Sequence, residues 1–129
     1  MTFVVLGPPA CTGSTVSFMG KGGRIVTKTD SHTLGGWTQA VKWAAKGAGV
    51  RVVAKPGAVA VSVRFEFVKP QSAQKREHPT VKPDIDKTLR ALLDALTGIA
   101  WEDDAQVVLV SASKSYGPDA KTEITVRNA

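Results

Sequence analysis

The sequence predicts one α+β domain over residues 1–129, with a mixed sheet of about four strands and two helices packed mainly on one face of it. Two patterns support this prediction. Between Ala58 and Val68, apolar and polar residues alternate, as they do in a strand with one buried face. From Trp37 to Ala48, apolar residues recur at helical spacing. A chain of 129 residues has room for a single modest core.

Two further segments complete the N-terminal half. Phe3–Leu6 is an apolar run that ends at Gly7-Pro8-Pro9, which predicts a first strand. Ala10–Leu34 is rich in Gly, Ser and Thr, and it predicts a long exposed loop that can include a short hairpin.

The C-terminal half predicts one helix and two strands. After a polar loop, the helix is expected from about Asp84 or Ile85 to Leu96, because Gly98 provides a stop. Gln106–Ser113 and Thr122–Arg127 are expected to pair as a hairpin around the turn at 116–119. The element order is therefore β-α-β-α-β-β.

The charge distribution favours a polyanionic partner and a bound cation. The net charge is +6, and residues 1–57 carry seven Lys or Arg but only one acid. Six acids fall between Asp84 and Asp104. Such an acidic segment repels phosphates in a protein that only binds them, but it fits a site where a divalent cation reverses the local charge.

The cysteine content and the lengths of the apolar segments indicate the cellular compartment. Cys11 is the only cysteine, so no disulfide can form within the chain. Thr2–Leu6 is too short for the apolar region of a signal peptide, and no apolar segment approaches the roughly 20 residues that span a bilayer. We expect a cytoplasmic protein that does not enter membranes.

The acidic residues predict a magnesium site. Asp103 and Asp104 come just before the strand expected at Gln106–Ser113, so one of these two carboxylates can approach Asp84 and Asp86 if that strand lies beside the helix. Three carboxylates this close repel one another unless a cation is bound. Mg²⁺ prefers hard oxygen ligands, and Mn²⁺ is a possible substitute. Such an ion can activate water and orient a phosphodiester. Carboxylates splayed apart would argue against this hypothesis.

The helix expected from about Asp84 or Ile85 to Leu96 determines where Asp86 and Arg90 lie. Asp86 is expected at the edge of the buried face, and Arg90 follows one turn later. Arg90, or a lysine of the preceding loop, would neutralise charge on the transition-state phosphate. Taken singly, each Asp is more often a helix cap or a solvated turn residue. The combination around one helix favours the metal site.

The segment from Pro83 to Val108 resembles the RusA family of Holliday-junction resolvases, which is common in phages and prophages. That family has an Asp-x-Asp opening to a helix, a basic residue four positions later, Asp-Ala-Leu, and then Asp-Asp-x-Gln-Val. The corresponding residues here are Asp84-Ile85-Asp86, Arg90, Asp94-Ala95-Leu96 and Asp103-Asp104-Ala105-Gln106-Val107.

The resemblance implies a homodimer that binds four-way junctions and makes paired, magnesium-dependent nicks in DNA recombination and repair. It also implies that Asp84, Asp86 and Asp104 are the essential carboxylates. We therefore expect these three side chains to bind Mg²⁺ in one pocket, with Asp103 assisting. The chain departs from the family pattern at two positions. Arg90 stands where the family usually has Lys, and unlike Lys it cannot donate a proton; Lys87 stands where the family usually has Asn.

Several cations are candidates for phosphate contacts, although a solvated loop is the alternative. They are Lys69, Lys75, Arg76, Lys82 and Lys87, together with Lys21 and Arg24 of the N-terminal loop. Trp37 and Trp43 are expected in the core or a dimer interface. Trp101 is expected to pack beneath the acidic turn, with stacking on an unpaired base as the alternative.

Three other functions are compatible with the sequence. One is a non-catalytic DNA-binding protein of the same fold, in which Lys87 and Arg90 have weakened the site. A second is a different magnesium phosphodiesterase that acts on RNA or on flaps. The third is a basic assembly protein without a metal site.

Overall fold

A computed structural model of the chain describes residues 1–10, 15–19, 25–29 and 32–129. The helices are α1 (His32–Gly47) and α2 (Ile85–Leu96). Short 3₁₀ turns occupy Gln71–Ala73 and Asp104–Gln106. The strands are β1 (Thr2–Leu6), β2 (Thr15–Met19), β3 (Ile25–Thr29), β4 (Val59–Phe67), β5 (Val107–Tyr116) and β6 (Lys121–Asn128).

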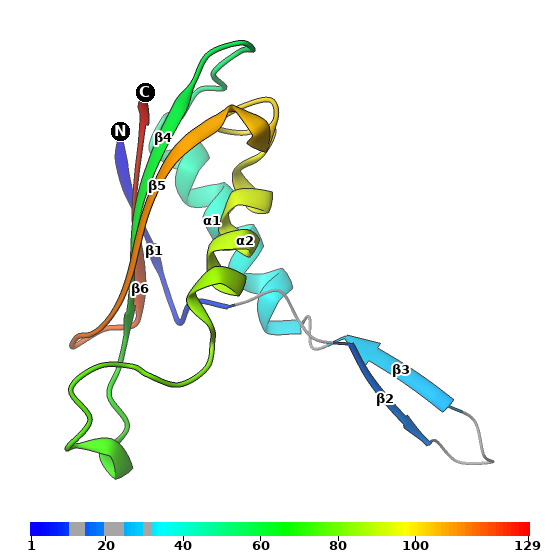
Figure 1. Cartoon of the computed structure of the whole chain (residues 1–129), viewed down its shortest axis with the longest axis vertical. Coiled ribbons are helices and arrows are strands. Elements are labelled where there is room, and N and C mark those ends of the chain that lie inside the picture. The colour runs from blue at the N-terminus through cyan, green and yellow to red at the C-terminus, as the bar shows by residue number, and fades with distance from the viewer. Residues whose placement is uncertain (11–14, 20–24, 30–31) are drawn as a thin grey trace.

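The main sheet has four strands in the order β1-β6-β4-β5, and both helices cover the same face of it (Figure 1). β6 runs antiparallel to β1 and to β4, whereas β5 runs parallel to β4. The predicted mixed α+β sheet, with its helices on one face, is therefore confirmed. β2 and β3 form a second, two-stranded antiparallel sheet within the segment predicted as a loop with an optional hairpin.

The predicted hairpin between the last two strands is wrong, because β4 lies between β5 and β6. The link through α2 carries the chain back parallel to β4, so β5 occupies one side of this apolar strand and β6 the other. The short connection after β5 crosses the end of β4, where the backbone N–H of Gly117 donates to the Phe67 carbonyl at 2.9 Å. Two strand spacings of about 4.8 Å are within the reach of such a link.

The core lies between the helices and the covered sheet face. β4 contributes Val61, Val63 and Phe65, all nearly or fully buried, as the alternation predicted. Trp37 of α1 packs against Phe65 with ring centroids 6.4 Å apart, so its predicted place in the core is confirmed. Trp43, by contrast, is exposed.

Most element boundaries agree with the sequence patterns, but α1 begins at His32, several residues before the predicted Trp37. The end of α2 is where Gly98 predicts it. Gly98 adopts φ +88°, a left-handed conformation that favours glycine, and its N–H donates to the Trp101 carbonyl at 2.6 Å. None of the helices in the described part of the chain is long and apolar enough to cross a membrane.

Candidate active site

The amino-terminal end of α2 presents two carboxylates. Asp84 is the N-cap residue, but its side chain makes no capping hydrogen bond. Thr88 contacts the Asp84 carbonyl instead, through its backbone N–H at 3.1 Å and its hydroxyl at 3.2 Å. Asp86 lies in the first turn and is exposed. Both carboxylates are therefore available to a ligand, at the helix end where the macrodipole favours negative charge.

A lysine from β5 fixes the backbone in front of these two acids. The Lys114 ammonium donates to the carbonyl oxygens of Val81 and Pro83, both at 2.8 Å. It therefore ties the loop that precedes α2 to the carboxyl end of β5. This contact places Asp84 beside the carboxyl end of β5, which is an edge strand of the sheet.

The second acidic motif lies beyond the opposite end of α2. Trp101 is fully buried, and its indole N–H donates to the Thr97 hydroxyl at 3.1 Å, which holds the following turn against the carboxyl end of the helix. The predicted packing of Trp101 is thus confirmed, and a buried ring cannot stack on a base. Figure 1 shows the two acidic motifs at opposite ends of α2.

Gln106 holds the acidic turn in place. Its amide oxygen accepts from the backbone N–H groups of Glu102 and Asp103, each at 2.9 Å. Its amide nitrogen donates to the carbonyls of Val53 at 3.0 Å and Gly57 at 2.9 Å. All the hydrogen-bonding capacity of this buried side chain goes into fastening the turn to the segment before β4.

Asp103 and Asp104 have different surroundings, although they are neighbours. One oxygen of Asp103 accepts from the Ala105 N–H at 3.0 Å, and the other lies 3.4 Å from the Lys55 ammonium. The Ala105 hydrogen bond, followed by the Lys55 contact, lowers the pKa of Asp103 below 3.8. The carboxylate of Asp103 is thus used within the turn, while Asp104 is exposed.

The expectation that one chain gathers Asp84, Asp86 and Asp104 is wrong. α2 has 12 residues, which corresponds to a length of roughly 18 Å between its ends. Among the described residues, no group of three or more His, Cys, Asp or Glu side chains is placed to hold a metal ion. A single chain offers Asp84 and Asp86 at one end of α2 and Asp104 at the other.

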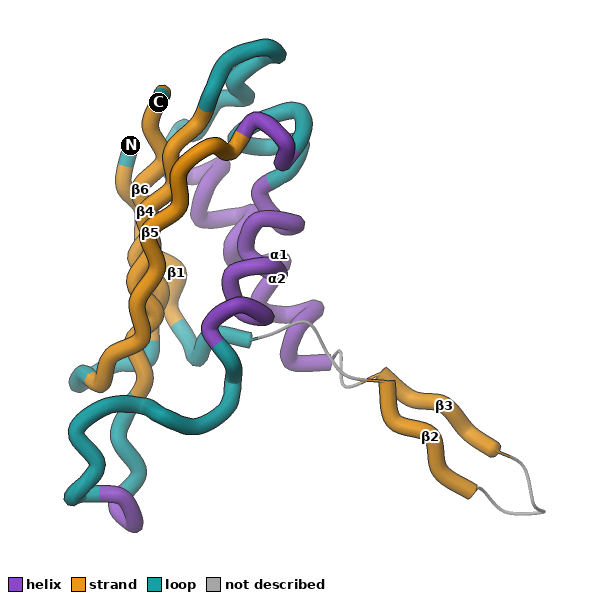
Figure 2. The backbone as a smooth tube through the Cα atoms, viewed as in Figure 1, coloured by secondary structure: helices purple, strands orange, loops and turns teal. Residues whose placement is uncertain are grey.

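The predicted cations lie around the first of these ends. Lys69 stands over the ring of Tyr116, with its ammonium 5.4 Å from the centroid, and Arg76 donates to the Tyr116 hydroxyl at 3.2 Å. Lys75 and Lys82 are exposed in the same loop. Figure 2 shows the path of this loop between β4 and α2. Lys21 and Arg24 lie outside the described residues.

The remaining two candidates are on α2. The Lys87 ammonium lies 3.9 Å from an Asp84 oxygen. Arg90 is exposed one turn after Asp86, and the structure forms no ion pair between these two described residues. Asp86 is more exposed than predicted, because the buried face of α2 is centred on the side of Thr88, Ala91 and Ala95.

An apolar surface that the motif analysis did not identify runs along the outer edge of the sheet. Three successive residues of the edge strand β5 are exposed: Val108 at 64%, Leu109 at 49% and Val110 at 39%. On α2, Ile85 is also exposed, and Leu89 and Leu93 are only partly buried. We call these six residues the apolar edge. The signal in the sequence was the unbroken run Val107–Val110, which an edge strand facing solvent rarely carries.

The family model described as "Endodeoxyribonuclease RusA" matches residues 14–127. The chain belongs to the RusA endodeoxyribonuclease family. A similar relative is the protein YqaN of Bacillus subtilis (strain 168), described as uncharacterized, which is 39% identical over 49 residues. That match covers 38% of this chain and 34% of the relative, so the chain spans about a third of that relative's length.

Proposed function

We propose that this RusA-family protein is a magnesium-dependent endonuclease that resolves four-way DNA junctions, and that it acts as a homodimer. The observation that carries the proposal is the placement of the acids. Asp84 and Asp86 stand at one end of the apolar edge, and Asp104 stands at the other. A two-fold axis across this edge would bring the two ends of different copies together.

The register of such a dimer follows from β5. Asp104 and Lys114 lie five positions before and after Leu109. When two β5 edges pack antiparallel around Leu109, Asp104 of one copy faces Lys114 of the other. Lys114 is bonded to the Pro83 carbonyl, next to Asp84. Each copy would therefore supply Asp104 to the Asp84–Asp86 pair of its partner.

Burial of the apolar edge would stabilise this arrangement. Removing an aliphatic side chain of this size from water contributes about 1.5–3 kcal/mol when it becomes fully buried. A two-fold interface uses the same patch on both copies, so each exposed residue of the edge counts twice. Val108, Leu109 and Val110 would lie nearest to the axis.

The donor set fits a hard divalent cation. All three proposed ligands (Asp84, Asp86 and Asp104) are carboxylates, and neither oxygen of Asp84 is used in capping the helix. When bound, Mg²⁺ supplies a concentrated positive charge that polarises the scissile phosphate. Asp103 is left out of the proposed ligand set, because both of its oxygens already have partners in the turn.

The side chains around the carboxylates would handle the nucleic acid. Arg90 is always protonated, so it can balance charge that develops on the phosphate but cannot donate a proton. Lys69, Lys75, Arg76 and Lys82 would contact the backbones of the junction arms. Two equivalent sites related by the two-fold axis would account for paired nicks on opposed strands. We further propose that the protein acts in recombination or repair, as a phage or prophage type of enzyme.

The test is a synthetic four-way junction and its matching linear duplex, each incubated with the protein with and without Mg²⁺ or Mn²⁺. We expect paired nicks in the junction only, and only with metal. Asp86→Asn and Asp104→Asn should retain junction binding but lower the cleavage rate by at least about a hundredfold. Asp103→Asn is the matched control, and it should retain most of the activity. Wild-type cleavage by Asp86→Asn or Asp104→Asn would refute the assignment.

One observation favours a second candidate, a junction-binding protein that does not cut. The Lys87 ammonium lies near Asp84 and stands where the family usually has Asn, so it could compete with a metal ion for that carboxylate. In the same assay, this candidate predicts a junction shift on a gel without nicking in either metal. Substitution Lys87→Asn would then restore cleavage.

A further inference from the structure

A small hollow lies where the ends of β4 and β5 meet the loop before α2. Its volume is about 140 Å³. Two aromatic residues, two prolines and two lysines are among the residues that line it: Phe67, Tyr116, Pro70, Pro79, Lys82 and Lys114. We call this hollow the ring pocket.

The size of the ring pocket suits one planar ring. An engineered apolar cavity of roughly 150 Å³ holds a single benzene molecule. Apart from its two lysines, the side chains that line the pocket are apolar or aromatic. Such surfaces provide the flat contacts on which nucleic-acid bases stack.

The charges at the ring pocket are all of one sign. Lys82 and Lys114 form part of its lining, and no carboxylate does. Lys69 and Arg76 both contact Tyr116, one over the ring and one at the hydroxyl. An apolar pocket bordered only by cations is complementary to a ligand that joins a ring to an anion, which describes a nucleotide.

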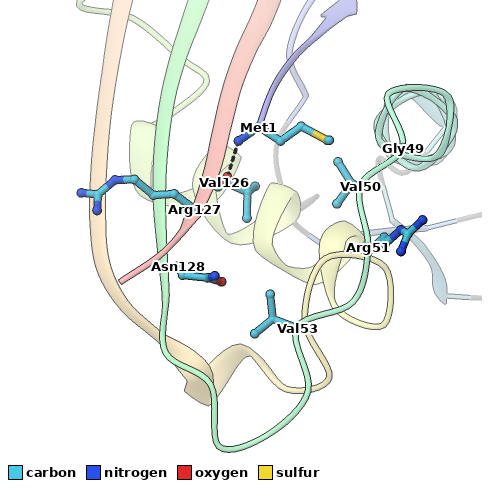
Figure 3. A pocket seen from close by; sticks show the side chains of 8 residues that line it. All are labelled: Met1, Gly49, Val50, Arg51, Val53, Val126, Arg127 and Asn128. Atoms are coloured by element: carbon cyan, nitrogen blue, oxygen red, sulfur yellow. Dashed lines mark hydrogen bonds between the residues drawn. The ribbon is translucent and has the colours of Figure 1, made fainter.

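A larger hollow elsewhere does not have this character. It has a volume of about 280 Å³ and includes the apolar side chains of Val50, Val53 and Val126. Arg51 and Arg127 border it, but both extend away from the space (Figure 3). Most of the side chains around it are therefore apolar, and neither arginine is directed into it.

We infer that the ring pocket binds one unstacked, single-ring base of a DNA strand at the branch point of its substrate. The inference rests on the proposed function and names a contact that would select branched DNA. Lys82 is two residues before Asp84, so the phosphates next to a base in the pocket lie close to the proposed metal ligands. A continuous duplex keeps its bases stacked and cannot fill the pocket, whereas a branch point releases them at lower cost.

The experiment fills the pocket from an exposed position on its wall. Val81 lines the pocket and is 46% exposed, so Val81→Trp can occupy the space without disturbing the core. Val52 has the same 46% exposure, lies outside the pocket lining, and makes Val52→Trp the matched control. Binding of full-length protein to a four-way junction, to linear duplex, and to oligo(dT) and oligo(dA) is measured without metal.

We expect Val81→Trp to weaken junction and oligo(dT) binding about tenfold, in line with the loss of one stacked base, and to leave duplex binding unchanged. Wild-type protein should prefer oligo(dT) to oligo(dA), and the variant should lose that preference. Val52→Trp should behave as wild type. Val68→Trp, at a second exposed residue of the lining, should reproduce Val81→Trp.

Three outcomes would overturn the inference. The first is wild-type binding to junction and oligo(dT) by both pocket variants. The second is an equal loss on duplex and junction, which would assign the pocket to general backbone contact. The third is a changed oligomeric state, which would assign it to a protein contact. If wild-type protein does not distinguish junction from duplex, the proposed function fails. The measurements with oligo(dT) and oligo(dA) still test whether the ring pocket binds a base.

Discussion

The proposed two-chain site makes a prediction that no single-chain site shares. Asp86→Asn removes a ligand at one end of α2, and Asp104→Asn removes one at the other. Each homodimer of either variant has two damaged sites. A mixed dimer, however, combines both damaged ends in one site and both intact ends in the other. Mixing two inactive variants should therefore restore cleavage.

The structure predicts how much cleavage activity the mixture of the two variants should recover. Roughly 18 Å of helix separates the two ends of α2, whereas Mg²⁺ holds its oxygen ligands at about 2.0–2.1 Å, so Asp104 cannot join the Asp84–Asp86 pair of its own chain. Random exchange of subunits makes half of the dimers mixed, and each mixed dimer has one intact site. Activity should thus recover to about a quarter of the wild-type number of sites.

The assay follows nicking of a labelled four-way junction after the two variants are mixed and allowed to exchange. Differently tagged copies, purified together, verify that mixed dimers have formed. Because a mixed dimer has one working site, single nicks should dominate over paired nicks. The control is a mixture of Asp84→Asn and Asp86→Asn, in which every dimer lacks an intact site. Recovery no greater than in this control would refute the two-chain arrangement.

Two further predictions concern the apolar edge and the acidic turn. Leu109→Glu would place two like charges near the two-fold axis, so we expect the dimer dissociation constant by analytical ultracentrifugation to rise at least about tenfold, and cleavage to fall with it. Leu6→Glu, on the exposed face of the opposite edge strand, is the control; an unchanged dimer in Leu109→Glu would exclude this interface. Asp103→Ala should lower the urea midpoint at pH 7, because it removes the bond to Ala105 and the Lys55 contact. The folded pKa of Asp103 lies below its ordinary 3.8, so this difference should be full above pH 3.8 and shrink as the pH falls through the lower folded value. A gap in urea midpoint that does not narrow as the pH is lowered below 3.8 would contradict this account.

Local patterns in the sequence were enough to predict most of the elements and the acidic motifs. The alternation from Ala58 to Val68 predicted β4 within one residue at each end, because one buried face imposes a period of two. Gly98 predicted the end of α2, since its conformation is open to glycine and costly for other residues. The Asp-x-Asp and Asp-Asp segments predicted the family that the family model matches.

What the sequence determined by itself was therefore local: which residues form strands and helices, which carry charge, and which family the chain belongs to. The tertiary structure alone decided that β4 separates β5 from β6, that α2 holds Asp84 and Asp104 apart, and that Val108 to Val110 remain exposed. The physical reason is one of range. Periodicity and capping act over a few residues, whereas strand order and the distance between two motifs depend on how rigid elements of fixed length pack across the whole core.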